Sequence, residues 1–487
     1  MGDYRVLFDG MVSASQTTAT PTAAMRWFVS RRMPAAEDGR AVRAPMGLRR
    51  IEAALLAAGC STEDVRIVTP EDLTRAIGPR TRVVGVSSGD PLGRGMNDGT
   101  MRGLAGGRTH IEVGFVRLMQ TLGRLREKHG FRVLFGGPGA WQLIQQPDRT
   151  AELGIDTVFS GFGERDAAGI FGRLAERNGV APVVEGRRPR PAEVPPIAGP
   201  TSMGVVEVSR GCGWGCSFCT MAREPMIHLP LATILSDVQT NVRGGVDSVS
   251  LISEDLFRYG STGARPNAAA LLGMLEAVRG TAGLRLIQTD HVNVASVMGL
   301  SDAELRAVHA TMTRGVRHEY LWVNIGVESA AGELVAANQG AAKIAPFTAD
   351  QWAGVCRAAA LRLIDAGFLP MVSLIFGLPG ETAEHVRRTL RWVNGLAGKR
   401  MMIFPLFFEP VAAGQRPFGV RDMTRGHWQL LRRCYELNFR WGPRMYQDNL
   451  RGAGEPWPRR ALLRIGSAVE VLQMKARFAV RSRRFAR

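Results

Sequence analysis

The sequence predicts an α/β protein in three parts: a doubly wound, Rossmann-like domain over residues 1–180, a partial (β/α)6 barrel over 204–410, and a small, basic, mostly helical region over 411–487. Two series of short segments rich in β-branched and aromatic residues, each alternating with amphipathic stretches, indicate the two α/β parts. Strands that alternate with helices form parallel sheets. A proline-rich stretch at 181–203 separates the two series and is expected to be a linker.

The first series alternates five expected strands with helices. Apolar residues recur at three-to-four spacing in residues 47–59 and 116–130, and Gly59 and Gly130 are placed to end these helices. Doubly wound sheets bind ligands at the carboxyl ends of their strands. The expected strands are residues 4–8, 64–68, 81–88, 131–137 and 156–161.

The second series contains six expected strands, which is consistent with a partial (β/α) barrel. In such barrels the chemistry takes place at the carboxyl ends of the strands. Beyond residue 410 the pattern becomes helical, aromatic and basic. The expected strands are residues 204–209, 248–253, 284–289, 321–328, 369–377 and 400–408.

The chain has 487 residues and a net charge of +18, and its only lysines are Lys128, Lys343, Lys399 and Lys475. The positive charge favours a negatively charged partner, although a coding bias towards arginine is an alternative cause. Six cysteines in so long a chain do not indicate a disulfide framework, so a reducing, cytoplasmic location is expected. No signal peptide is evident, and no apolar run approaches about 18 residues.

Three cysteines, Cys212, Cys216 and Cys219, fall within the segment SRGCGWGCSFC directly after an expected strand. The glycines between them let the backbone fold tightly around a bulky group. Structural zinc normally needs four ligands, and the remaining cysteines are isolated on helical patterns. Three thiolates on a cubane iron–sulfur cluster would leave one iron open to a small molecule.

In this context the CxxxCxxC spacing, with Phe218 before the third cysteine, resembles the hallmark of the radical SAM superfamily. The resemblance implies that Cys212, Cys216 and Cys219 hold a [4Fe–4S] cluster whose open iron chelates S-adenosylmethionine. An electron, supplied by an external reductant of the flavodoxin or ferredoxin type, then releases a 5′-deoxyadenosyl radical.

The same resemblance implies further residues at the strand ends. The segment ISEDLF matches the family's methionine-binding segment loosely at Ser253 and Glu254, because both glycines of that segment are missing. NIGVES resembles the strand end that places Glu328 and Ser329 beside the nucleoside or the methionine carboxylate. FGLPGET resembles the sixth-strand turn against the adenine, with Gly377, Pro379 and Gly380. A structural ion pair is the alternative for Glu328.

His291 ends the third barrel strand and is expected either to act as an acid, base or substrate contact or to be a hydrogen-bonded structural histidine. With Glu328, it is the candidate catalytic residue of the barrel.

A Rossmann-like domain before such a barrel resembles that of cobalamin-dependent radical SAM enzymes. The Asp-x-His-x-x-Gly motif is absent, so no histidine is expected on cobalt. Methylthiotransferases carry a second three-cysteine cluster in this domain, whereas this chain has only Cys60 there. A purely structural domain is the alternative. The implied cobalamin-contacting residues are Ser87, Ser88, Gly136, Gly137, Gly139, Gly161, Gly163 and Glu164.

The resemblance covers about residues 1–410 and predicts methyl transfer to an unactivated carbon of a small-molecule or lipid-like substrate. A radical cyclase, rearrangement or C–C bond-forming enzyme is the alternative, and a non-catalytic iron–sulfur or cobalamin sensor is a third possibility of another class.

The C-terminal segment from Arg459 to Arg487 is amphipathic and ends in six cations among residues 475–487. It predicts peripheral contact with the anionic inner surface of the membrane, whereas docking of its apolar face onto the barrel is equally natural. Nucleic acid is not the favoured partner. The apolar face is expected to comprise Leu462, Leu463, Ile465, Val469, Leu472 and Phe478.

Overall fold

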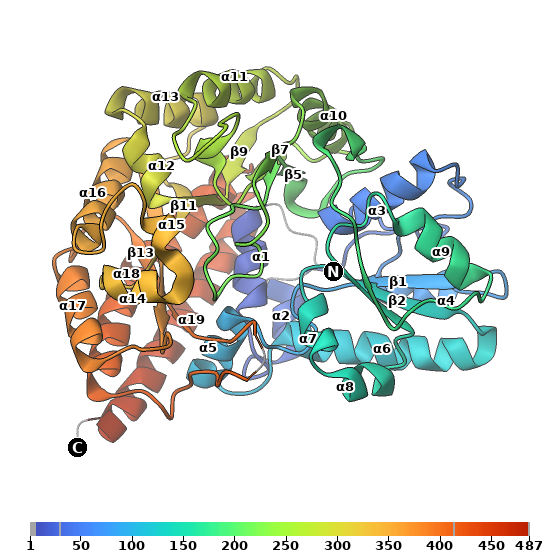
Figure 1. Ribbon diagram of the computed structural model, residues 1–487, viewed down its shortest axis with the longest axis horizontal. Coiled ribbons are helices and arrows are strands. Elements are labelled where there is room, and N and C mark those ends of the chain that lie inside the picture. The colour runs from blue at the N-terminus through green and yellow to red at the C-terminus, as the bar shows by residue number, and fades with distance from the viewer. Residues whose placement is uncertain (1–5, 29–30, 413, 486–487) are drawn as a thin grey trace.

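The computed structural model describes residues 6–28, 31–412 and 414–485. An α/β layer built around a four-stranded sheet lies beside a larger half-open barrel, and two long helices cover the outer side of the barrel (Figure 1). The α/β class with parallel sheets and a helical C-terminal region, which the sequence predicts, is therefore confirmed.

The N-terminal sheet is entirely parallel and contains strands β1 (Val83–Ser87), β2 (Arg132–Gly136), β3 (Thr157–Ser160) and β4 (Val183–Glu185), in the order β1-β2-β3-β4. Strand β4 comes from the proline-rich stretch between the two α/β parts.

Helices cover both faces of this sheet. Val133 and Phe135 pack with helix α6 (His110–His129), whereas Leu134 faces the other side and packs with helix α9 (Ala167–Ala175). This alternation follows from the two-residue period of a strand, which points successive side chains to opposite faces.

Two strands expected in the first series are wrong. Residues 7–8 begin helix α1 (Leu7–Ala14), whose Phe8 lies 5.6 Å from Tyr446 between ring centroids, and residues 4–5 lie outside the described part. A short apolar run suits either a helix or a strand, and here packing against a distant helix decides. Residues 64–68 form only an isolated bridge, between Arg40 and Val68. Helix α3 (Met46–Ala57) and helix α6 are as expected, and Gly130 ends α6 with φ +70°.

The barrel contains all six expected strands, in two parallel sheets ordered β5-β8-β9 and β10-β11-β12-β13. The chain passes from one sheet to the other between β9 and the short strand β10 (His291–Val292). The strands are β5 (Val205–Glu207), β8 (Ser248–Ile252), β9 (Leu286–Thr289), β11 (Leu321–Glu328), β12 (Phe368–Phe376) and β13 (Met402–Phe407).

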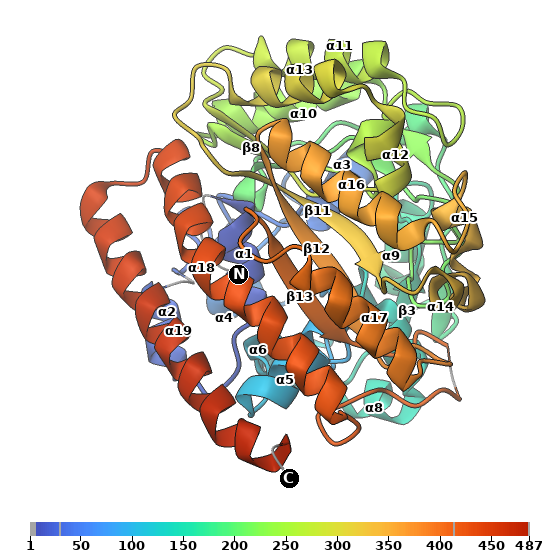
Figure 2. The same ribbon diagram turned by 90° about the vertical axis from the view of Figure 1, so that its left-hand side faces the viewer.

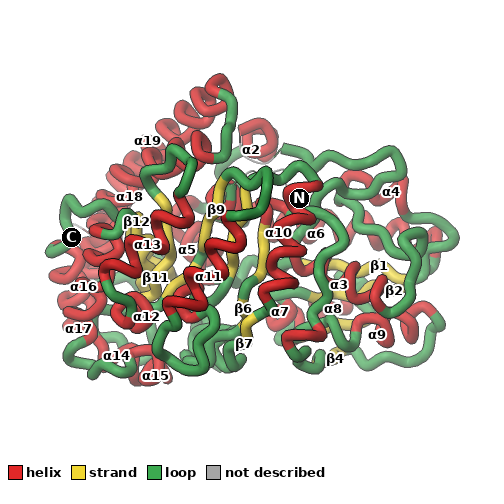
Figure 3. Tube along the Cα trace, turned by 90° about the horizontal axis from the view of Figure 1, so that it is seen from above, coloured by secondary structure: helices red, strands yellow, loops and turns green. Residues whose placement is uncertain are grey.

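Helices lie outside the barrel strands (Figure 3). Their inward faces and the strand faces turned towards them form one large apolar core. Trp322, Leu369 and Met371, on the other face of the strands, belong to a second cluster. The helices are α10 (Leu231–Arg243), α11 (Ala268–Arg279), α13 (Asp302–Thr313), α16 (Trp352–Asp365) and α17 (Ala383–Asn394).

Two long helices, α18 (Arg425–Gly452) and α19 (Trp457–Phe485), form the C-terminal region (Figure 2). Helix α18 packs on α17 and β13, and α19 packs on α18 and on helices α2 (Thr22–Phe28) and α5 (Met96–Ala105) of the N-terminal part. Within the described ranges, none of the helices has the length and apolar character needed to cross a bilayer.

The carboxyl ends of the strands in the two α/β parts face each other. Arg94, in the loop after β1, lies 3.2 Å from the carboxylate of Glu409, which follows β13. Arg210, beside the cysteine segment, pairs with Glu164, which follows β3. Thr100 accepts a hydrogen bond of 2.7 Å from the backbone N–H of Phe407. The edges at which both kinds of fold bind ligands therefore share one interface.

Candidate functional site

The cysteine segment is a closed loop between two short antiparallel strands, β6 (Ser209–Arg210) and β7 (Ile227–His228). It follows the first barrel strand, β5, directly. Gly211 has φ +70°, and a Cβ at this position would lie 2.4 Å from the carbonyl oxygen of Glu224. A side chain cannot be accommodated there, so the loop needs glycine at its first turn.

The three thiols of this loop share one apolar cluster with Phe218 and Leu378. Burial raises the pKa of Cys212 to about 11 and also raises the pKa of Cys216 and Cys219. Three thiolates gathered there are stable only if a positively charged group joins them. The backbone N–H groups of Trp214 and Met221 lower the pKa of Cys212 and Cys219 respectively, so they too stabilise the thiolates.

The thiols do not have the placement of ligands to a single ion: in the described part of the chain, no group of three or more His, Cys, Asp or Glu side chains could hold one metal ion. In an iron–sulfur cluster each thiolate binds its own iron, so the three cysteines need not converge on one point. The donor set, its apolar surroundings and its missing positive charge therefore fit a [4Fe–4S] cluster.

Asn338 connects the cysteine loop to the turn after β12. Its carbonyl oxygen accepts hydrogen bonds of 3.1 Å from both the backbone N–H and the hydroxyl of Ser217, and its side-chain amide donates to the carbonyl of Pro379 at 3.0 Å. On the other side, Arg258 donates to the carbonyl of Cys212 at 3.0 Å and lies 4.3 Å from the Trp214 ring centroid. These contacts fix the loop relative to the strand ends.

Glu254 and His291 lie on the same side of the cysteine loop. Burial raises the pKa of Glu254, which also interacts electrostatically with Cys212, Cys219 and His291. No hydrogen bond to its carboxylate is found among the described residues. Glu254 is therefore a carboxylate available to a cationic ligand.

His291 is half exposed, and its Nδ1 lies 3.0 Å from the carboxylate of Asp290. Burial among protein atoms disfavours the imidazolium, but the charges of Asp290 and Glu254 outweigh it and raise the pKa of His291 to about 9. A pKa raised in this way favours the imidazolium form, which can donate a hydrogen bond or a proton.

Glu328 forms a buried ion pair, which is the alternative that the sequence left open for this residue, and its partner is Lys343. Its carboxylate binds the ammonium of Lys343 and accepts a hydrogen bond of 3.0 Å from Ser373. Glu328 has φ +63°, and a Cβ at Gly326 would lie 2.3 Å from its carboxylate. Glycine at 326 therefore provides the space for the pair. Lys343 also interacts with Cys216 and Cys219, so the pair borders the cysteine loop.

The hydroxyls expected to contact S-adenosylmethionine are engaged within the protein. Ser253 bonds the hydroxyl of Ser209 and accepts from the backbone N–H of Asp255, whereas Ser329 bonds Thr389 at 3.2 Å.

The expected turn at Gly377, Pro379 and Gly380 is present after β12. Gly377 and Gly380 have φ +79° and +85°. A Cβ on Gly377 would lie 2.2 Å from the Phe418 ring, which packs on the turn. The glycine is therefore explained by contact with the segment that follows β13.

In the N-terminal domain, Ser87, Gly137 and Gly161 are exposed and end three neighbouring strands at the edge that faces the barrel. This row of small, exposed residues suits a flat ligand that lies across the edge, because none of the three has a side chain larger than that of serine. Ser88 and Gly136 adjoin this row.

Three other expected residues of this edge have contacts of their own. A Cβ on Gly139 would lie 2.3 Å from Pro91, and one on Gly163 would lie 2.3 Å from Ile51. The side chain of Glu164 is buried in its pair with Arg210. These residues shape the edge and join it to the barrel.

The structure thus gathers Cys212, Cys216, Cys219, Glu254, His291 and Glu328 around one loop. Sequence reasoning missed Lys343 and Asn338. The rarity of lysine in this arginine-rich chain was the available signal for Lys343. Asn338 lies in an irregular turn whose left-handed Gln339, with φ +60°, has no clear sequence signature.

Comparison with protein-family models gives a match to the Radical SAM superfamily over residues 206–393. Among curated proteins, the chain is 33% identical over 88 residues to the ribosomal protein uS12 methylthiotransferase RimO of Bordetella pertussis, which is 17% of this chain and 20% of that protein. It is 26% identical over 239 residues to the tRNA-2-methylthio-N(6)-dimethylallyladenosine synthase of Pelobacter propionicus, which is 48% of this chain and 50% of that protein. The chain therefore spans between a fifth and a half of these relatives.

Among solved structures, the fold is similar to that of the radical S-adenosylmethionine methyltransferase TsrM from Kitasatospora setae, with a TM-score of 0.52 and 15% identity. The similarity covers 76% of this chain and 72% of TsrM in the structure with tryptophan and a SAM analogue. It covers 74% and 72% in the structure of TsrM with cobalamin and a [4Fe–4S] cluster bound. At this identity the similarity is one of fold.

Proposed function

From the premise that residues 206–393 form a radical SAM domain, we propose that the protein is a cobalamin-dependent radical SAM enzyme that transfers a methyl group to an unactivated carbon of a small-molecule or lipid-like substrate. The observation that carries the proposal is the facing arrangement of two carboxyl edges. One edge bears the cysteine loop, the other bears the exposed row at Ser87, Gly137 and Gly161, and Arg210–Glu164 joins them. The structure of TsrM, whose fold is similar, contains cobalamin and a [4Fe–4S] cluster.

In this proposal Cys212, Cys216 and Cys219 hold the [4Fe–4S] cluster, and the β1–β3 edge holds cobalamin without a histidine ligand on cobalt. The cluster with S-adenosylmethionine supplies radical-generating cleavage, and cobalamin supplies a transferable methyl group. Glu254 receives the ammonium of S-adenosylmethionine, because its carboxylate is buried and has no described partner. Lys343 supplies positive charge for the carboxylate of S-adenosylmethionine.

His291 has a separate part in the proposal. Because Asp290 keeps its imidazole protonated at neutral pH, His291 donates a hydrogen bond or a proton to the substrate. Glu328, already paired with Lys343, positions that lysine and does not act as a free base.

Methylthiotransferases are among the curated relatives. The family resemblance implies a second three-cysteine cluster in the N-terminal domain of such enzymes, whereas residues 1–180 of this chain contain only Cys60. We therefore do not favour this activity. A radical cyclase or C–C bond-forming enzyme remains the alternative on the same scaffold, and a non-catalytic sensor is the alternative of another class.

The test is anaerobic reconstitution of the full chain with iron, sulfide and hydroxocobalamin. We expect about one cobalamin per chain to survive gel filtration, and label from methyl-labelled S-adenosylmethionine to appear on it. Ser87→Phe places a ring on the exposed edge and should abolish cobalamin retention while the cluster absorbance stays. Thr62→Phe, on an exposed turn of the same domain, is the matched control and should retain cobalamin.

Retention of the cluster alone by the wild type, with cobalamin-independent turnover, would refute the cobalamin assignment. Cleavage of one S-adenosylmethionine per product without methyl incorporation would indicate the cyclase. Absence of S-adenosylmethionine cleavage, even with reductant and with an extract of cells that lack the gene for this protein, would indicate the sensor.

We also propose that α19 contacts an anionic membrane surface. The apolar residues that the sequence assigned to one face are divided between two: Leu463 and Phe478 are buried against the body, whereas Ile465, Val469 and Leu472 are exposed. Five of the nine exposed large apolar side chains of the described surface lie on this helix. The exposed residues Ile465, Val469, Leu472 and Val480 are separated by four, three and eight residues, so they lie on one side of the helix and form a stripe.

The positive charge beside this stripe favours an anionic lipid surface as its binding partner. Arg464 and Lys475 are exposed on α19, and the sequence of residues 475–487 contains six cations and no acid. Each cation near an anionic surface contributes about 1 kcal/mol, and apolar side chains at the boundary add their burial. A second copy of this basic helix would instead meet like charge.

Sedimentation with phosphatidylcholine vesicles, with and without phosphatidylglycerol, tests this surface. The wild type should pellet only with phosphatidylglycerol and less as salt rises. Ile465→Ser/Leu472→Ser should weaken binding, and removal of residues 475–487 should abolish it. Leu231→Ser, at an exposed leucine on α10, should bind as the wild type does. Equal pelleting of all variants would refute the proposal. If the wild type has twice the expected mass in solution and Ile465→Ser/Leu472→Ser does not, the stripe binds a second copy of the chain and not a membrane.

A further inference from the structure

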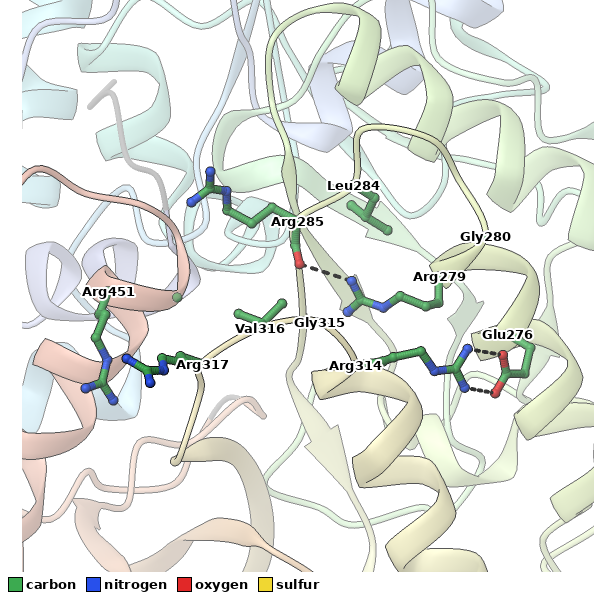
Figure 4. Close-up of a pocket in the computed structure, with 11 residues that line it drawn as sticks. Glu276, Arg279, Gly280, Leu284, Arg285, Arg314, Gly315, Val316, Arg317 and Arg451 are labelled. Atoms are coloured by element: carbon green, nitrogen blue, oxygen red, sulfur yellow. Dashed lines mark hydrogen bonds and ion pairs between the residues drawn. The ribbon is translucent and has the colours of Figure 1, made fainter.

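An open pocket is lined by residues of helix α11 and of the segments before β9 and β11 (Figure 4). Its volume is about 890 Å³. Leu284 and Arg285 precede β9, and residues 314–317 precede β11, so the pocket lies at the amino ends of strands whose carboxyl ends form the candidate active site. Gly452, at the end of α18, closes one side.

Arginine dominates the lining of this pocket. The only carboxylate among the lining residues is Glu276, which both terminal nitrogens of Arg314 bind at 2.8 and 2.6 Å. The lining arginines are Arg279, Arg285, Arg314, Arg317 and Arg451.

Two of these arginines lack a carboxylate partner. Arg279 donates to the carbonyls of Arg285, at 3.0 Å, and of Thr311 and Met312. Among the residues that the structure describes, no carboxylate lies within ion-pair distance of Arg279 or Arg317. Figure 4 shows the Arg317 side chain projecting toward that of Arg451 and away from Glu276.

The other two exposed arginines are partly neutralised from outside the pocket. Arg285 lies 3.4 Å from Asp247, and Arg451 pairs with Asp448 and, at 3.3 Å, with Glu319. Burial and the charge of Arg314 lower the pKa of Arg279, which shows that cations are crowded here without full compensation.

A smaller pocket of about 430 Å³ adjoins the first, because Arg451 lines both. It adds Arg444, Arg460 and Arg464, with Asp448 and Glu319 as its carboxylates. The two pockets together are lined by eight arginines and three carboxylates, and no lysine.

We infer that these adjoining pockets bind a phosphate-bearing anion at the amino end of the barrel, remote from the candidate active site. The guanidinium group presents paired N–H donors that match two phosphate oxygens, and several such groups around an open pocket suit a ligand with more than one negative charge. The arginines are spaced over two pockets, so a single small monovalent anion would leave most of them unused.

A soluble phosphate compound and a phospholipid headgroup share this chemistry. Arg464 lines the second pocket and is adjacent in sequence to Ile465 of the exposed α19 stripe. The test therefore has a soluble arm and a lipid arm, and its readout is binding, so it is independent of the proposed enzyme activity.

In the soluble arm, sodium pyrophosphate is titrated calorimetrically into the full chain at fixed ionic strength, with chloride as reference. Arg285→Ser/Arg317→Ser removes two exposed side chains and leaves the carbonyl of Arg285 in place for Arg279. We expect affinity to fall on the order of ten-fold without a change in the unfolding temperature of the free protein. Arg117→Ser, at an exposed arginine of α6, should bind as the wild type does.

In the lipid arm, the same variants are sedimented with phosphatidic acid vesicles. Loss of pyrophosphate binding in the double variant assigns the pocket to soluble phosphates. Variant-sensitive binding to vesicles alone assigns it to a lipid headgroup, and Ile465→Ser/Leu472→Ser separates this effect from docking through α19. If the wild type binds neither probe, or if the double variant binds both as the wild type does, the inference is overturned.

Discussion

Replacement of Cys212, Cys216 and Cys219 by alanine is expected to remove essentially all cluster iron and all cleavage of S-adenosylmethionine. The wild type should take up about four irons and four sulfides per chain after anaerobic reconstitution. Each thiolate binds its own iron, and the surrounding Phe218 and Leu378 offer no substitute ligand. Iron and sulfide analysis, together with the visible spectrum and 5′-deoxyadenosine formation, measures the effect.

Cys356→Ala is the matched control, because this thiol is buried in helix α16 and burial raises its pKa strongly as well. Its iron content should equal that of the wild type, although loss of a buried side-chain atom lowers stability slightly. One tightly bound zinc per wild-type chain, or full iron retention by the triple variant, would contradict the assignment.

Lys343→Met is expected to destabilise the protein by about 3–5 kcal/mol. The substitution leaves the carboxylate of Glu328 buried without its cation, since both side chains are more than nine-tenths buried and Ser373 alone cannot compensate the charge. The midpoint of chemical unfolding of the full chain, followed by tryptophan fluorescence, measures the loss.

The double variant Lys343→Met/Glu328→Gln removes both charges and should regain most of this stability, because an uncompensated buried charge is the main cost. Lys399→Met, at an exposed lysine, should unfold within about 0.5 kcal/mol of the wild type. If Lys343→Met unfolds as the wild type does, the pair is not a structural unit. If the double variant regains stability but does not bind S-adenosylmethionine, the Lys343–Glu328 pair takes part in binding as well as in stability.

The two helix faces of α19 show what a sequence pattern leaves open. Its apolar residues are spaced for a helix, but Leu463 and Phe478 pack on the body while Ile465 and Leu472 face outward. The pattern extends around most of the helix, so periodicity alone could not say which side docks. Contact of Phe478 with Trp428 and Tyr435 of α18 decides it, at ring-centroid distances of 5.4 and 4.8 Å.

The first strand expected at residues 4–8 failed for a related reason. Five residues with β-branched and aromatic side chains satisfy a strand pattern, but they also suit the start of a buried helix. The hydrogen bond of 2.7 Å from Tyr446 to Asp9 joins α1 to α18, a partner 437 residues away in the chain. No local signal carries that contact.

The barrel strands and the cysteine loop follow from local sequence patterns. The six strands are runs of mostly apolar residues, which are buried whatever their neighbours are. The spacing of Cys212, Cys216 and Cys219, together with Gly211, specifies a tight turn locally. The charges that surround that loop follow from the fold and not from the local sequence. Glu328 meets Lys343, and Glu254 meets His291, because strand ends distant in sequence converge at one edge. Burial and neighbouring charge set their protonation, and both depend on the whole fold.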